Sequence, residues 1–152
     1  MADDRIRPDD LYETDFVAWT EAQADALRAR RSGGNALDYD HLAEEIADLG
    51  RSDVRACRSL IDRIVEHLIK LEAFPHDQAV PHWRREVRVF RRDLADTLTA
   101  TIRLRLEPRL ADVFSAMRSG LIEDGYDLAA FDREPYGWEQ VVSPNWLPGG
   151  DG

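Results

Sequence analysis

Hydrophobic residues along this chain recur at intervals of three and four positions, the spacing of helices that bury one face. Alternating runs that would indicate strands are missing except at 102–106, where apolar residues alternate with arginines. A single short strand would have no partner to pair with. Leucine or isoleucine also stands at every fourth position from Leu98 to Leu110, so we predict a helix here with a break near Pro108. The pattern as a whole predicts an all-α fold.

Five main helices are predicted, at residues 13–31, 39–49, 53–74, 82–98 and 108–124. Gly50 is expected to close the second helix, because glycine accepts the left-handed conformation that ends helices. Ser52 is then expected to cap the third. The third helix has apolar side chains over a wide arc, so we place it at the centre of a helical bundle. The expected buried stripe of the second helix consists of Leu42, Ile46 and Leu49.

The last part of the chain differs from the rest, since its aromatic residues stand among glycines and prolines. We expect this aromatic-rich tail to pack on the bundle, because otherwise much apolar surface would meet water. Within it, Gly137 is expected to begin a short helix that ends at Val142, with Gln140 completing a capping box. The predicted organisation is a disordered N-terminus at 1–10, a single bundle domain at 11–148 and a disordered C-terminus at 149–152.

Charge and composition argue against several classes of function. The 152 residues contain 30 acidic and 20 basic side chains, a net charge of −10, which argues against a general nucleic-acid binder. No apolar run is long enough to cross a membrane. The only cysteine, Cys57, excludes an intramolecular disulfide, which fits a cytoplasmic location. The charge is uneven: residues 1–50 sum to −8, 51–106 to +4 and 107–152 to −6. A basic middle therefore lies between acidic ends.

Two ionisable residues, Glu45 and His67, follow the apolar spacing of their predicted helices. A carboxylate and an imidazole on buried flanks are costly without a partner, so the two are expected to meet. One interpretation is a hydrogen-bonded pair that fixes helix register. The other is a metal or acid–base site completed by His41 or Glu66, as helical bundles can build. The Glu-x-x-His spacing of such sites is missing, so the sequence indicates no bound metal, no cofactor and no defined catalytic set.

A second candidate lies on the predicted helix 82–98, where four arginines fall on one side of the helix: Arg84, Arg88, Arg91 and Arg92. One interpretation is a solvated face that pairs with the acidic helices. The other is an anion-binding face for phosphate, nucleic acid or an acidic partner, since arginine recognises phosphate and carboxylate through paired hydrogen bonds.

Taken in order, several segments resemble the bacterial family known as domain of unknown function 29. The likeness covers residues 11–148, and the segments that carry it are Tyr12–Phe16 with Trp19, Leu42–Ile46 with Leu49–Ser52, His67–Lys70, Trp83 and Arg84 with Arg91, and Pro135–Pro148. The chain departs from the family pattern at Leu71, His82 and Phe90. The resemblance implies an all-helical bacterial protein and implies no activity.

The function class that we expect is a non-enzymatic module that binds an unidentified protein partner, with self-association left open. Two alternatives remain at this point. One is a small metal-binding or acid–base enzyme that uses Glu45 and His67, and the other is a nucleic-acid-binding regulator that uses the arginine face.

Overall fold

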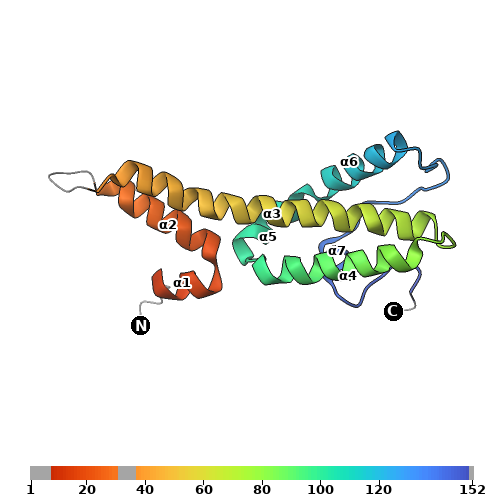
Figure 1. Cartoon of the computed structure of the whole chain (residues 1–152), viewed down its shortest axis with the longest axis horizontal. Coiled ribbons are helices and arrows are strands. Elements are labelled where there is room, and N and C mark those ends of the chain that lie inside the picture. Colours follow the sequence, from red (N-terminus) through yellow and green to blue (C-terminus); the bar gives the residue numbers. More distant parts are fainter. Residues whose placement is uncertain (1–7, 31–36, 151–152) are drawn as a thin grey trace. The chain divides into compact units, whose positions relative to one another are not determined.

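The computed structural model describes residues 8–30 and 37–150 (Figure 1). These residues form helices and no strands, which confirms the all-α prediction. The elements are α1 (Pro8–Thr14), α2 (Phe16–Ala29), α3 (Tyr39–Ala73), α4 (Val80–Thr97), α5 (Ala100–Leu106), the 3-10 turn η1 (Glu107–Arg109), α6 (Leu110–Glu123) and α7 (Trp138–Val142). Within these ranges, no helix combines the length and the hydrophobicity of a membrane span.

The chain gathers into two compact units, residues 1–56 with 99–103 and residues 57–98 with 104–152. The division into a domain at 11–148 with disordered ends stays a prediction. Most of the predicted disordered N-terminus, and residues 151–152 at the other end, lie outside the described residues. Residues 8–10 form the start of α1.

The predicted first helix is two helices, because the chain leaves the helical conformation at Asp15 (φ −151°). The Asp15 carboxylate accepts a hydrogen bond from the Ala18 N–H at 3.2 Å and so caps α2. It also accepts bonds from the Thr101 N–H at 2.9 Å and the Thr101 hydroxyl at 2.7 Å, at the start of α5. Burial acts to raise the pKa of Asp15, but the hydrogen bonds together hold that pKa below its ordinary value. One buried carboxylate therefore serves the first turns of two helices.

Gly50 does not end a helix, and this prediction was wrong. The predicted helices 39–49 and 53–74 are one continuous helix, α3, so Ser52 caps nothing. Gly50 lies where α3 meets Thr20 of α2: a β-carbon added to it would stand 2.2 Å from Thr20 Oγ1. Thr20 is fully buried, and its hydroxyl donates to the Val17 carbonyl at 2.8 Å. The glycine thus permits close approach of two helices rather than a turn.

The buried face of the first half of α3 also differs from the prediction. Its buried positions are the small residues Ala43 and Gly50, whereas Leu42 is 40% exposed and Leu49 is 52% exposed. Close approach to α2 explains the difference, because only small side chains fit between backbones so near each other. The leucines consequently lie on an adjacent face of the helix.

The second unit has the apolar core expected around the second half of α3. Six residues of this segment are at most 1% exposed: Cys57, Ile61, Ile64, Val65, Leu68 and Ile69. α4 runs back along it (Figure 1), and its predicted stripe is confirmed as buried: Trp83, Val87, Phe90 and Leu94. α6 adds Leu110, Phe114 and Leu121 to the core.

The tail packs on the second unit, as predicted. Its buried side chains are Leu128, Tyr136, Trp138 and Val141. The short helix α7 begins after Gly137, whose N–H donates to Gln140 Oε1 at 3.0 Å, which confirms the expected capping contact. The tail therefore extends the core with aromatic and aliphatic side chains.

Candidate functional site

Glu45 and His67 do not form a pair. Both lie on the uninterrupted helix α3, 22 positions apart, so no turn at Gly50 brings them together. Glu45 is exposed rather than on a buried flank. The expectation of a pair assumed two helices that turn back on each other at Gly50, and the continuity of α3 removes that possibility.

His67 is accommodated locally. Its Nδ1 lies 2.8 Å from the Arg63 carbonyl one turn earlier in α3, and its ring meets Phe90 of α4 edge-on at 5.6 Å between centroids. Burial lowers the pKa of His67, which favours the neutral ring. The histidine thus lies in a half-buried position beside α4, and no carboxylate of the described residues forms a hydrogen bond or ion pair with it.

The other two proposed members of a metal or acid–base site, His41 and Glu66, each contact another residue. His41 is exposed and its Nδ1 contacts the Asp38 carboxylate, which raises the pKa of His41 and lowers that of Asp38. Glu66 is paired with Lys70 one turn further along α3. Over residues 8–30 and 37–150, no three His, Cys, Asp or Glu side chains are placed to hold a metal ion together.

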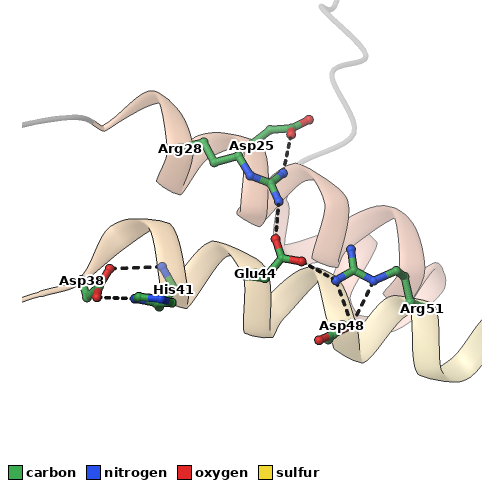
Figure 2. Close-up of polar contacts among 7 residues, drawn as sticks. All are labelled: Asp25, Arg28, Asp38, His41, Glu44, Asp48 and Arg51. Atoms are coloured by element: carbon green, nitrogen blue, oxygen red, sulfur yellow. Dashed lines mark hydrogen bonds and ion pairs between the residues drawn. The ribbon is translucent and has the colours of Figure 1, made fainter.

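The first unit carries an exposed charge network between α2 and α3, which Figure 2 shows. Arg51 binds Glu44 at 2.8 Å and Asp48 at 2.8 Å, and Glu44 also receives Arg28 of α2 at 3.4 Å. Arg28 in turn contacts Asp25 at 3.5 Å. Each member is exposed, so these pairs orient side chains but add little stability.

A different face of α3 carries what we call the leucine stripe: Leu42, Ile46 and Leu49. Glu44, Asp48 and Arg51 of the network each follow a stripe residue by two positions, so the stripe is turned away from them. The three follow the i, i+4, i+7 spacing, and the two leucines are exposed as stated above. Glu45 stands on the same side, three positions after Leu42 and four before Leu49. Neither Glu45 nor the following Asp53 has a hydrogen bond or ion pair with another residue in the part of the chain that the structure describes. An apolar stripe with free carboxylates beside it is therefore available on this helix.

The four arginines of α4 do not share one environment. Arg84, Arg88 and Arg92 are exposed, as a solvated or anion-binding face requires. Arg91 is 4% exposed and points into the tail. Its guanidinium donates to the carbonyls of Gln140 at 2.7 Å, Val141 at 2.8 Å and Trp146 at 2.8 Å. Arg91 thus satisfies carbonyls at the end of α7 and after it, a role that the arginine spacing could not reveal.

A second polar anchor of the tail was not predicted from the sequence. Arg133 donates to both oxygens of Glu72 at 2.7 and 2.8 Å, and the Tyr136 hydroxyl donates to the same carboxylate at 2.8 Å. The Arg133 guanidinium also lies 4.2 Å from the centre of the Tyr136 ring. Burial, followed by the Glu72 contact, raises the pKa of the Tyr136 hydroxyl well above its usual range. Because these residues are 61 and 64 positions apart in the chain, no local pattern connects them.

The comparisons with known proteins agree with this fold. The model of the family described as domain of unknown function DUF29 matches residues 11–147. The chain is similar to a crystal structure of an alpha-helical protein of unknown function from Rhodospirillum rubrum, with 30% sequence identity and a TM-score of 0.70. The similarity covers 89% of this chain and 90% of that one. No protein of the curated set matches the chain.

Proposed function

We propose that this chain, which belongs to the family described as domain of unknown function DUF29, is a non-enzymatic protein-interaction module. The partner that it holds is a basic amphipathic segment, which docks on the leucine stripe of α3. The observation that carries this proposal is the exposure of Leu42 and Leu49 at helical spacing beside Glu45 and Asp53, which form no hydrogen bond or ion pair with any described residue.

The apolar residues of the stripe share one helical spacing. Single exposed leucines are common on protein surfaces and need no explanation. Here Leu42, Ile46 and Leu49 recur along one face of a helix, while α2 already covers another face through Gly50. Anchors at i, i+4 and i+7 are the arrangement by which helices bind apolar partner segments. The stripe therefore supports a docking surface rather than an unfilled position in the core.

The charges along the stripe favour a basic partner. Glu45 lies between Leu42 and Leu49 on the stripe, and Asp53 follows Leu49 by four positions, so both carboxylates stand along it. Glu44 and Asp48 lie on another side of the helix and are bound to Arg51. Charges of one sign on a surface favour a partner of the opposite sign and repel their own kind. A basic amphipathic segment fits this surface, whereas a second copy of the same stripe would set carboxylates against carboxylates.

Isothermal titration with synthetic helical peptides tests the proposal. One peptide has leucine at intervals of three and four positions and lysine elsewhere, which gives a basic amphipathic helix, and a second replaces each lysine by glutamate. We expect the basic peptide to bind with a Kd of about 1 to 100 μM and the acidic peptide not to bind. Glu45→Gln should weaken binding and reduce its dependence on salt, because one carboxylate beside the stripe is neutralised.

The decisive variant is Leu42→Ser with Leu49→Ser, and its matched control is Ile122→Ser, since Ile122 is 47% exposed on α6. The double change should weaken binding of the basic peptide at least about tenfold, and the control should leave it unchanged. Equal binding of both peptides, an equal loss in the control, or self-association through the stripe in place of peptide binding would each contradict the proposal.

A further inference from the structure

A cavity of about 360 Å³ lies in the second unit, between α4 and the end of α7 with the segment that follows it. Its residues are Arg88, Arg91, Arg92, Ala95, Val142 and Pro144. The volume falls in the range of small-molecule sites, which are mostly apolar with a few convergent polar groups. Here three arginines provide the polar groups and three small or aliphatic residues provide the rest.

The two exposed arginines of the cavity have guanidinium groups available for a ligand. Arg88 forms no hydrogen bond or ion pair with any residue of the described ranges. Arg92 makes only a 3.5 Å contact with the adjacent Asp93, and its side chain is 71% exposed. A bound carboxylate or phosphate would therefore not have to displace a close ion pair from either arginine.

The third arginine makes the cavity electropositive from its buried side. Arg91 donates to three backbone carbonyls, as described above, and contacts no carboxylate. Burial lowers the pKa of Arg91 to about 10, which still leaves the group charged at neutral pH. A buried charge that is balanced only by carbonyl dipoles gains from an anion nearby.

We propose that this cavity binds a small organic anion, namely a carboxylate or phosphate ester with an apolar body. Arg88 and Arg92 hold the anionic group, since guanidinium groups bind both head groups through paired hydrogen bonds. The apolar body lies against Ala95, Val142 and Pro144. The site is distinct from the leucine stripe, which belongs to the other unit.

A small anion fits this surface better than nucleic acid does. Glu86, Asp93 and Asp96 lie among the arginines of α4, so the helix does not present a continuous basic track to a phosphate backbone. The cavity is instead a local site, and its apolar residues would make no favourable contact with a nucleic-acid phosphate backbone. A DNA oligonucleotide that competes with the small anion at low salt would overturn this assignment.

Titration of the full chain with four probes, followed by NMR, tests the proposal. The probes are hexyl phosphate, hexanoate, inorganic phosphate and hexanol. We expect at least one of the two amphiphilic anions to bind with a Kd below about 1 mM, at least about tenfold tighter than inorganic phosphate, and hexanol not to bind. Which of the two anions binds more tightly identifies the head group. No binding by either, or binding of hexanol as tight as that of the anions, would overturn the proposal.

Three variants locate the site. Arg88→Gln with Arg92→Gln should weaken binding of the better anion at least about tenfold, whereas Arg85→Gln, on the same helix but outside the cavity, should leave it unchanged. Ala95→Trp fills the cavity without altering charge and should also abolish binding. An equal loss in Arg85→Gln, or full binding in Ala95→Trp, would show that the anion binds by charge alone elsewhere and would refute the cavity site.

Discussion

Replacing Gly50 by alanine tests how closely α2 and α3 pack at this position. In the interior of an exposed helix the change from glycine to alanine stabilises a protein by about 1 kcal/mol, because alanine loses less backbone entropy on folding. Gly50 is an interior residue of α3, so helix propensity alone predicts a more stable protein. The contact with Thr20 predicts the opposite sign.

The magnitude follows from the distances at this contact. The new β-carbon would stand 2.2 Å from Thr20 Oγ1, far inside van der Waals contact, so either the threonine rotates or the helices separate. Rotation breaks the hydroxyl's bond to the Val17 carbonyl, and a buried hydroxyl without a partner costs about 1 to 3 kcal/mol. Separation of the helices costs a similar amount, about 1 to 3 kcal/mol. After the gain in propensity, Gly50→Ala should destabilise the protein by up to about 2 kcal/mol.

Urea denaturation followed by far-ultraviolet circular dichroism measures the change, and Gly120→Ala is the matched control. Gly120 is also inside a helix, α6, but a β-carbon there would meet no atom within 4 Å. The control should therefore stabilise by up to about 1 kcal/mol.

A second background isolates the contact. With Thr20→Ala already in place, the new β-carbon would be 3.4 Å from the β-carbon at position 20, a tight but tolerable contact. In that background Gly50→Ala should be neutral or stabilising, which gives a coupling energy of about 2 kcal/mol between the two positions. Stabilisation by Gly50→Ala in the native background, or the same destabilisation with and without Thr20→Ala, would refute the close-approach explanation.

Four further substitutions check the packing of each unit by denaturation. Asp15→Ala should cost about 1 to 3 kcal/mol near neutral pH. Because the folded pKa of Asp15 is lowered, its contribution is lost as the pH falls through that value, so the cost should shrink in acid and a constant cost would contradict the capping role. Arg91→Met leaves three carbonyls without their donor and should cost about 3 to 5 kcal/mol; a loss under about 1 kcal/mol would contradict the anchor. Trp83→Ala should cost about 3 to 5 kcal/mol because the ring is buried on α4, and a loss under about 1 kcal/mol would refute that packing. His67→Leu should change stability by less than about 1 kcal/mol, since no acidic partner is left unpaired, and a larger loss would indicate one.

Helical periodicity predicted the fold class and the core of the second unit because both depend on local spacing. The stripe of α4 from Trp83 to Leu94 and the wide apolar arc of α3 after Cys57 are buried as expected. The composition of the tail predicted its packing, since leaving its aromatic side chains exposed to water is unfavourable. Predicting these features did not require knowing which helices pack against each other.

Features that depend on tertiary contact were missed. A glycine can either end a helix or let a neighbouring backbone approach closely. For Gly50, only the position of Thr20 shows which of these two roles applies. The misplaced helix end in turn produced the expected pair of Glu45 and His67. It also hid the leucine stripe, because Leu42 and Leu49 have the spacing of buried residues whether or not another element covers them.

The candidate sites were predicted in part. The arginines of α4 were identified from their spacing, and three of the four are exposed as an anion-binding face requires. Arg91 is the exception, because the carbonyls that it satisfies come from residues 49 to 55 positions later in the chain. Neither the cavity of α4 nor the cluster around Glu72 leaves a local pattern, since each is assembled from helix and tail together.

Site-specific photo-crosslinking tests the proposed function most directly. A benzophenone side chain placed at Leu42, in cells of the organism that encodes the protein, captures whatever lies on the stripe, and the same group at Leu104, exposed on α5, is the control. We predict that sequencing of the crosslinked peptides at Leu42 will identify a basic amphipathic segment of one partner protein, which the control does not capture. The same products at both positions, chaperones alone, or only peptides from a second copy of this chain would contradict it.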